Sequence, residues 1–157
     1  MKKKLINLEE DFLDFIKLCN KYDVRYLLIG GYAVSIHGYP RTTKDMDVCI
    51  EMSDENAVKM VKVIDDFGFA SLKLTKADFL KEHGITQLGY TPLRIDIIND
   101  LDGVSFDKAW ENKKVVNMLN IAVNFIGYHE LLVVKEKAGR QQDIADVKKL
   151  KNRNKPK

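Results

Sequence analysis

Apolar residues recur at helical spacing near the start of the chain, where Leu8, Phe12 and Cys19 belong to a stripe that predicts one amphipathic helix over residues 8–21. Short runs rich in β-branched and aromatic residues follow, and they are typical of strands. The pattern predicts strands at 25–29, 46–51, 84–90, 93–99, 114–118 and 121–126, and helices at 32–37, 53–67, 105–110, 128–138 and 141–150. Because strands and helices are mixed, we expect an α/β fold with helices packed against a sheet.

Length and composition favour one ordinary domain. The chain has 157 residues, of which 45% are hydrophobic and 31% charged, so we expect a single domain over residues 1–150 followed by a basic tail at 151–157. No apolar run approaches the roughly 20 residues of a membrane span, and the basic start turns acidic at Glu9, which predicts a cytoplasmic protein with no membrane partner. Cys19 and Cys49 form no metal-binding or redox spacing, and we expect both to be reduced core residues.

Positive charge is concentrated at the end of the chain. The net charge is only +3, yet residues 148–157 hold six Lys or Arg residues and no acid. A solvated chain end is the favoured interpretation. The alternative is attraction to a polyanion such as RNA, which predicts binding that weakens with salt.

Three aspartates are the strongest candidates for chemistry. Asp45 and Asp47 lie two residues apart on a predicted strand and therefore share one face, and Asp96 lies in a later apolar strand. If the three converge, each pair repels by on the order of 4 kcal/mol at an intermediate dielectric, so a cation must sit among them. Oxygen ligands favour Mg²⁺ or Mn²⁺ over zinc. In the alternative interpretation the pair faces solvent at a strand end and Arg94 neutralises Asp96.

Gly30-Gly31 is a second candidate, because it joins a predicted strand to a predicted helix. Backbone N–H groups without covering side chains suit a phosphate. A tight turn that merely needs a positive φ explains two glycines equally well.

The stretch Ile29–Val48 fits the pattern GGxAVxxHGxxRxTxDxD. It resembles the DNA polymerase β-like nucleotidyltransferase superfamily, in particular the minimal bacterial nucleotidyltransferases of the abortive-infection (AbiEii-type) toxin group. A later stretch, 135–146, resembles the closing helical motif of that group, with Lys135, Arg140, Asp143 and Asp146 at matching places. The resemblance spans residues 24–150 and implies the nucleotidyltransferase fold, a mixed β-sheet with C-terminal helices.

The resemblance also implies roles for individual residues. Asp45 and Asp47 would hold two Mg²⁺ ions, for which Mn²⁺ can substitute, and Asp96 would bind one ion and help to deprotonate the attacking hydroxyl. The implied nucleotide contacts are Gly30, Gly31, Ser35, Arg41, Thr43, Lys135 and Arg140. Many members have Gly-Ser in place of Gly-Gly, so backbone donors must suffice here. We expect Asp143 to orient Lys135 or Arg140, and His37 to be a hydrogen-bonded structural residue.

The function expected from these features is transfer of a nucleoside monophosphate from an NTP, ATP included, to a hydroxyl, with release of pyrophosphate. An RNA or tRNA end is the favoured acceptor, in a toxin–antitoxin or phage-defence role with a cognate antitoxin as partner. An antibiotic of the aminoglycoside or lincosamide type and a protein hydroxyl are alternative acceptors. A catalytically silent module that binds nucleotide or RNA is the rival from another class.

Overall fold

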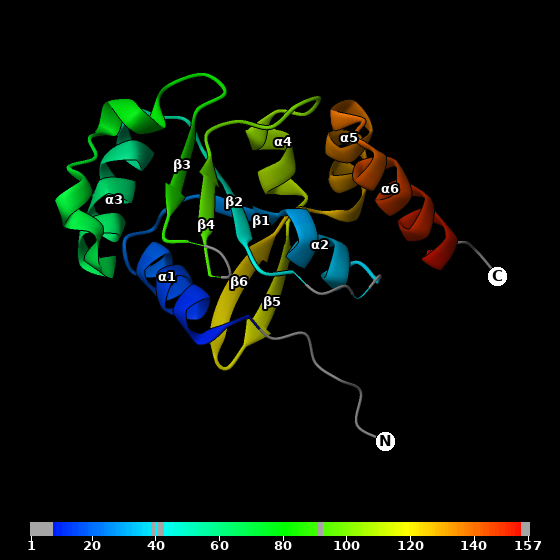
Figure 1. The fold of residues 1–157 in the computed structure, drawn as a ribbon, viewed down its shortest axis with the longest axis horizontal. Helices are drawn as coiled ribbons and strands as arrows, with labels where there is room; N and C mark the ends of the chain where they lie inside the picture. The colour runs from blue at the N-terminus through cyan, green and yellow to red at the C-terminus, as the bar shows by residue number, and fades with distance from the viewer. Residues whose placement is uncertain (1–7, 39, 41–42, 91–92, 155–157) are drawn as a thin grey trace.

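The computed structural model describes residues 8–38, 40, 43–90 and 93–154 (Figure 1). The helices are α1 (Glu10–Lys21), α2 (Gly30–Ile36), α3 (Asp54–Ile64), α4 (Phe106–Glu111), α5 (Tyr128–Ala138) and α6 (Gln141–Arg153). The strands are β1 (Tyr26–Ile29), β2 (Met46–Ile50), β3 (Ile85–Leu88), β4 (Ile95–Ile98), β5 (Lys114–Met118) and β6 (Ile121–Phe125). Three short turns of helix, η1 (Asp65–Phe69), η2 (Ala70–Leu72) and η3 (Lys76–Phe79), connect α3 to β3.

The strands form one mixed sheet of six strands in the order β3-β4-β2-β1-β6-β5. β2 runs parallel to β4 and β1 runs parallel to β6, while the remaining neighbours are antiparallel. The predicted α/β class is therefore confirmed. The register pairs Asp47 with Ile29 on one side and with Asp96 on the other. Residues that are far apart in the sequence thus meet at one place on the sheet.

The helices gather in two groups in Figure 1, with α1 and α3 at the left and α2, α5 and α6 at the right. Helix α1 packs against α3, α2 contacts β1 and β2, and α5 packs against α6. The stripe predicted on α1 is buried, and Phe12 meets the ring of Tyr32 on α2 edge to face at 5.9 Å. Contacts of this kind fix α2, and hence the end of β1, against the rest of the core.

All the predicted helices and strands are present, but several of their ends differ. Helix α2 begins at Gly30 instead of residue 32, α1 at Glu10 instead of residue 8, and β4 at Ile95 instead of residue 93. Helix α3 begins as predicted, because the Ser53 hydroxyl accepts a bond from the Asn56 N–H at 3.2 Å. It ends at Ile64 instead of residue 67, and Gly68 with φ 106° lies within η1. Helix α6 continues to Arg153, three residues past the predicted end at 150. Basic residues in a last turn interact favourably with the helix dipole, so part of the predicted tail is helical.

Strands β3 and β4 correspond to the two strands predicted at 84–90 and 93–99. They pair antiparallel, with Leu88 opposite Ile95. Residues 91 and 92, between them, lie outside the described part of the chain. Residue 7 lies outside it as well, and Glu9 precedes α1 without a side-chain cap bond.

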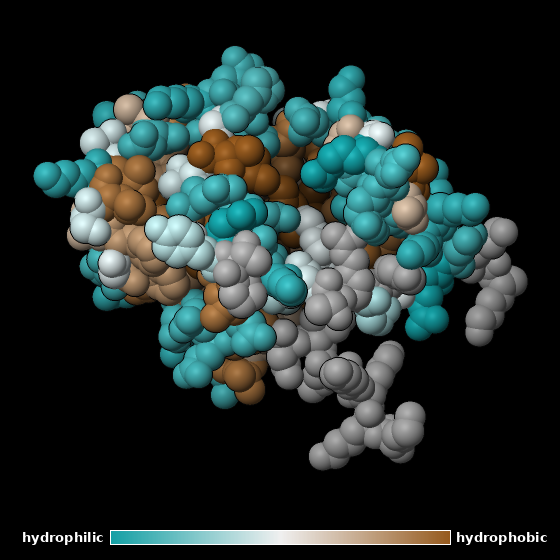
Figure 2. All heavy atoms as spheres, viewed as in Figure 1, coloured by the Kyte–Doolittle hydropathy of each residue, from teal (hydrophilic) through white to brown (hydrophobic). Residues whose placement is uncertain are grey.

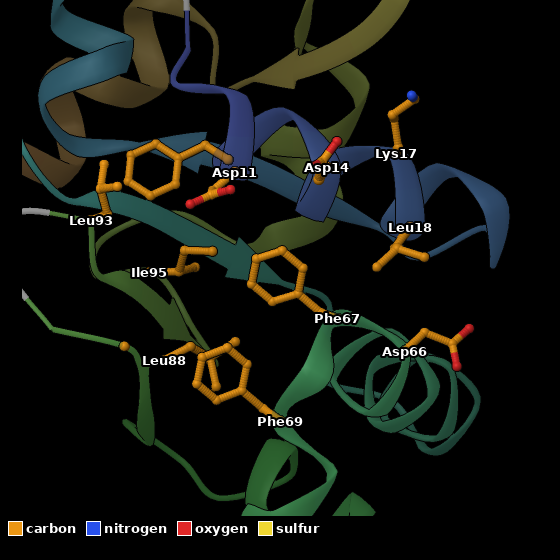
Figure 3. Close-up of a pocket in the computed structure, with 12 residues that line it drawn as sticks. Asp11, Asp14, Lys17, Leu18, Asp66, Phe67, Phe69, Leu88, Leu93 and Ile95 are labelled. Carbon is orange, nitrogen blue, oxygen red and sulfur yellow. The ribbon is translucent and has the colours of Figure 1, made fainter.

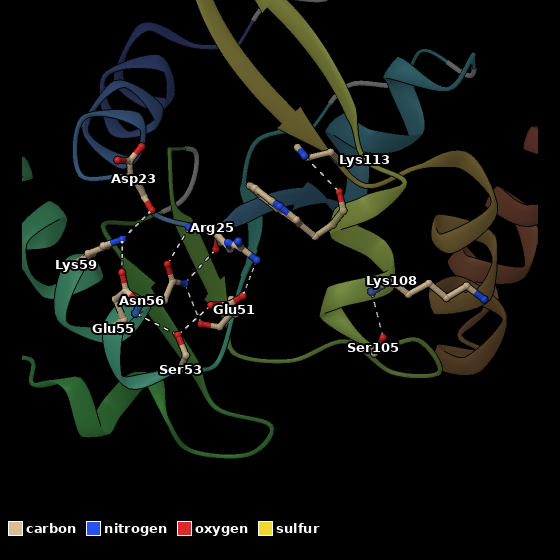
Figure 4. Close-up of polar contacts among 11 residues, drawn as sticks. Asp23, Arg25, Glu51, Ser53, Glu55, Asn56, Lys59, Ser105, Lys108 and Lys113 are labelled. Atoms are coloured by element: carbon tan, nitrogen blue, oxygen red, sulfur yellow. Dashed lines mark hydrogen bonds and ion pairs between the residues drawn. The ribbon is translucent and has the colours of Figure 1, made fainter.

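A polar network joins the start of β1 to the end of β2, at the other end of these strands from Asp47 (Figure 4). The Asn56 side chain accepts a bond from the Arg25 N–H at 2.8 Å and donates to the carbonyl oxygens of Arg25 and Glu51 at 3.1 and 2.8 Å. The Arg25 guanidinium also pairs with the Glu51 carboxylate at 3.3 Å. These bonds satisfy the backbone where the pairing of β1 with β2 ends.

Both cysteines are free and buried, as predicted, and burial raises the pKa of each thiol. Hydrophilic residues cover most of the face shown in Figure 2. Among the described residues, the longest apolar helical stretches are too short to cross a membrane.

Candidate functional site

The three predicted aspartates come together at the start of β2 and β4. Asp45 lies at a bend one residue before β2, whereas the prediction placed it on the strand. Asp47 lies on β2 directly beside Asp96 on β4. Met46, Val48 and Ile50 alternate with Asp47 along β2 and are fully buried. The parallel pairing of β2 with β4 is what brings the later aspartate to the earlier pair.

Arg94 lies among these carboxylates. Its Nε and Nη2 atoms donate to the two oxygens of Asp96 at 2.8 and 3.1 Å, and Nη2 also lies 3.3 Å from Asp45 Oδ2. A planar guanidinium suits this two-pronged contact. The sequence suggested Arg94 as a partner of Asp96, and the structure adds Asp45 as its second partner.

The negative charge of the cluster is only partly neutralised. Burial, together with the neighbouring charges of Asp96 and Asp45, raises the pKa of Asp47 to about 6, against opposing effects of Lys135 and Arg94. One oxygen of Asp45, Oδ1, is buried and has no hydrogen-bond partner among the described residues. A buried carboxylate oxygen without a partner is costly, so the donor set fits a divalent cation that prefers oxygen ligands.

No set of one carboxylate oxygen from each of the three aspartates has all its members within 4.8 Å of one another. Within the described part of the chain, a group of this kind is formed by Glu82, His83 and Asp100 instead. Two of these three side chains are exposed, and the His83 ring pairs with Asp100 at 3.3 Å. Sequence reasoning missed this group because its members come from two separate loops.

Gly30 packs directly against Asp47. The backbone of Gly30 has φ 70°, and a Cβ atom at this position would lie 2.2 Å from Asp47 Oδ2. Both the conformation and the close approach require glycine here. The turn interpretation is therefore correct for Gly30, while its predicted phosphate contact and that of Gly31, which is buried at the start of α2, stay predictions.

Helices α5 and α6 place two cations near the aspartates. Lys135 is buried, and its Nζ atom lies 3.3 Å from Asp143 Oδ1 and 3.0 Å from Asp146 Oδ2. The Arg140 guanidinium is largely exposed and donates to Asp143 at 2.6 Å. Burial acts to raise the pKa of Asp143, but the hydrogen bond from Arg140 and the charge of Lys135 prevail and lower it. Asp143 thus contacts both cations, as the sequence suggested.

The remaining predicted residues lie around this cluster. The Thr43 hydroxyl donates to the carbonyl oxygen of Asp45 at 3.2 Å, which braces the bend before β2. Ser35 is buried on α2 with an exposed fraction of 5%. His37 donates through Nε2 to the carbonyl oxygen of Ile126 at 2.7 Å, and burial lowers its pKa, which agrees with a structural role. Arg41 lies outside the described residues.

A groove of about 620 Å³ lies between α1, η1 and the β3–β4 edge (Figure 3). Phe67 and Phe69 form part of its apolar lining, and their rings stack at 5.8 Å. Ile95 also lines the groove and precedes Asp96. Since successive strand residues face opposite sides of a sheet, the groove lies behind the carboxylates. The pattern of apolar residues alone assigned Phe67 to the core.

No family model matches the sequence, and no curated protein sequence matches it either. Solved structures do match. A Thermotoga maritima protein described as a nucleotidyltransferase aligns with a TM-score of 0.61 at 12% identity, covering 90% of each chain. The lincosamide antibiotic adenylyltransferase LnuA, solved with lincomycin, aligns with a TM-score of 0.56 at 17% identity, covering 92% of this chain and 97% of LnuA.

The protein ANT(2")-Ia, solved in complex with adenylyl-2"-tobramycin, aligns with a TM-score of 0.57 at 8% identity, covering 90% of this chain and 86% of ANT(2")-Ia. At these identities the similarity shows the fold alone. The chain therefore has the nucleotidyltransferase fold, as predicted, and the proposed AbiEii-type subgroup stays a prediction.

Proposed function

We propose that the protein is a metal-dependent nucleotidyltransferase whose active site is the aspartate cluster at the start of β2 and β4. The observation that supports this most strongly is that the half-buried Asp45, Asp47 and Asp96 lie together beside Gly30, with one buried oxygen of Asp45 left without a hydrogen-bond partner among the described residues. Charges of one sign are not kept together in a partly buried place without a cation to balance them. Arg94 supplies only one positive charge to three carboxylates.

Asp45 and Asp47 would hold two Mg²⁺ ions, and Asp96 would hold one of them. Bound ions of this kind stabilise the attacking and leaving oxygens of an in-line displacement. Asp96 accepts the proton of the acceptor hydroxyl as the acceptor oxygen bonds to the α-phosphorus of the NTP. The bond from that phosphorus to the bridging oxygen breaks, and pyrophosphate leaves.

The cations on the C-terminal helices bind the triphosphate in this proposal. Lys135 is held in place by two buried carboxylates, so it loses little conformational freedom when an anion binds. Arg140 is exposed and can reach a phosphate in solution. Gly30, Gly31, Ser35, Arg41 and Thr43 complete the proposed nucleotide contacts.

An RNA end is the proposed acceptor, and a cognate antitoxin the proposed partner, on the basis of the motif at residues 29–48 and the basic residues of 148–157. A hydroxylated antibiotic is the second candidate acceptor. It is favoured by structural similarity over nearly the full length of LnuA, which was solved with lincomycin.

Label transfer separates these acceptors. The purified protein is incubated with Mg²⁺ and each α-labelled NTP in turn, first with total RNA and then with lincosamides and aminoglycosides. We expect label in RNA that Asp96→Asn abolishes, since the amide cannot accept the proton. Label in an antibiotic and none in RNA would identify the antibiotic as the acceptor. Nucleotide binding without any transfer, unchanged in Asp45→Asn, would support the silent binding module and refute the enzyme.

A further inference from the structure

The side chain of Arg94 occupies the oxygens that the proposed metal ions need. Both oxygens of Asp96 accept from its guanidinium, and Asp45 Oδ2 lies 3.3 Å from Nη2. Each of these oxygens retains a second lone pair, but the guanidinium charge beside it repels a divalent ion at the same carboxylate. Metal ligation and the Arg94 contacts therefore compete for the same atoms.

The arginine also bridges two of the aspartates. A single guanidinium nitrogen, Nη2, lies 3.1 Å from Asp96 Oδ2 and 3.3 Å from Asp45 Oδ2. Asp47 and Asp96 are direct neighbours across the paired strands, yet no set of one oxygen from each of the three aspartates gathers within 4.8 Å. Arg94 thus occupies the place between two carboxylates that a divalent ion would have to bind together.

The side chain of Arg94 is more exposed than the carboxylate that it binds. Its side chain keeps 30% of its surface exposed, whereas that of Asp96 keeps 14%. The guanidinium therefore lies at the solvent side of the cluster, where its long side chain can turn outwards without repacking the core. A phosphate that binds from solvent offers the planar guanidinium of Arg94 two oxygens in the same geometry as a carboxylate.

We propose that Arg94 is a positioning residue that substitutes for the metal ions in the free protein and passes to a nucleotide phosphate when the ions bind. This proposal rests on the function proposed above. Nucleotide and metal then bind cooperatively, because the nucleotide gives the displaced arginine a new partner and so lowers the cost of freeing Asp45 and Asp96. The chain is thereby kept from binding divalent cations tightly before the nucleotide arrives.

The test is Mn²⁺ binding, measured by electron paramagnetic resonance of the free ion, with and without an α,β-methylene NTP. Every protein carries Glu82→Gln and Asp100→Asn, which remove both negative charges of the Glu82–His83–Asp100 group and so weaken its hold on Mn²⁺. Arg94→Gln is compared with Arg94→Lys, which keeps the charge but loses the fork. Circular dichroism verifies that each variant is folded.

Arg25→Gln is the matched control, since it also removes one arginine from an ion pair with a carboxylate. Arg25 lies four residues from Ile29, the partner of Asp47, which is roughly 13 Å along the strand and beyond the screening length of about 10 Å at 0.1 M salt. Its loss should leave the metal affinity of the cluster unchanged.

Without nucleotide, we expect Arg94→Gln to bind Mn²⁺ at least about tenfold more tightly than the parent protein, with Arg94→Lys between them. The gain in Mn²⁺ affinity on adding nucleotide should shrink in the same order. Equal Mn²⁺ affinity in Arg94→Gln and its parent would overturn the role of Arg94 and leave the proposed function intact. Absence of Mn²⁺ binding from every folded variant, with or without nucleotide, would overturn the proposed function itself.

Discussion

Replacing Asp47 by asparagine should stabilise the metal-free protein at neutral pH. Burial and the charges of Asp96 and Asp45 raise the pKa of Asp47 to about 6 from its ordinary value of 3.8. At 1.36 kcal/mol for each pKa unit, this difference corresponds to at most about 3 kcal/mol of folding free energy that ionised Asp47 costs. Asparagine has nearly the same shape and no charge, so it removes that cost.

The sign of the pH dependence follows from the raised pKa. Between about pH 4 and pH 6 the folded protein retains a proton on Asp47 that the unfolded chain has lost, so stability falls as pH rises. The free-energy cost of ionised Asp47 has its full value above the pKa of the folded state and is absent below the pKa of the unfolded state. The difference in free energy of unfolding between Asp47→Asn and wild type should therefore be near zero at about pH 4 and grow to its full value by about pH 7.

Urea denaturation in EDTA, followed by circular dichroism between about pH 4 and pH 8, measures this difference. The exposed Asp102 supplies a matched control, since Asp102→Asn removes the same charge outside the cluster. Adding Mg²⁺ should reverse the order at neutral pH, because the ion stabilises the wild type by binding and finds a weakened site in the variant. Asp47→Asn that is less stable than wild type in EDTA, or a difference independent of pH, would refute the reasoning.

Three further predictions concern the surroundings of the site. Gly30→Ala should destabilise the fold by more than Gly68→Ala and should weaken Mn²⁺ binding. Both positions have positive φ, but only a Cβ at Gly30 collides with Asp47. Urea midpoints and Mn²⁺ titration of the two variants measure the difference. Lys135→Met should cost about 3–5 kcal/mol of stability by leaving Asp143 without its buried cation, and an unchanged urea midpoint would contradict this. The two buried thiols should react with a disulfide reagent only at the rate of unfolding, and fast labelling of the native protein would argue against their burial.

Much of the fold was accessible from the sequence because hydrophobic periodicity is a local property. The spacing of Asp45 and Asp47 indicated a shared site, since alternation along a strand needs no knowledge of the rest of the fold. The arrival of Asp96 at the same place depended on the parallel pairing of β2 with β4, so the strand patterns offered it only as a condition and the motif resemblance implied it.

Other features depend on tertiary contacts that no local pattern encodes. The second contact of Arg94, to Asp45, exists only because β4 lies beside β2. The buried pairing of Lys135 with Asp146 needs α5 and α6 to pack together. Burial of the cluster, which raises the pKa of Asp47, likewise results from the assembled fold.

Crystals of the protein soaked with Mn²⁺ and an α,β-methylene NTP test the central claim most directly, because the anomalous signal of manganese locates the ions without assumptions about the reaction. We predict manganese on Asp45 and Asp47, with Asp96 sharing one ion and Arg94 moved onto a phosphate. Manganese bound only by Glu82, His83 and Asp100, with Arg94 still paired to Asp96, would contradict the claim.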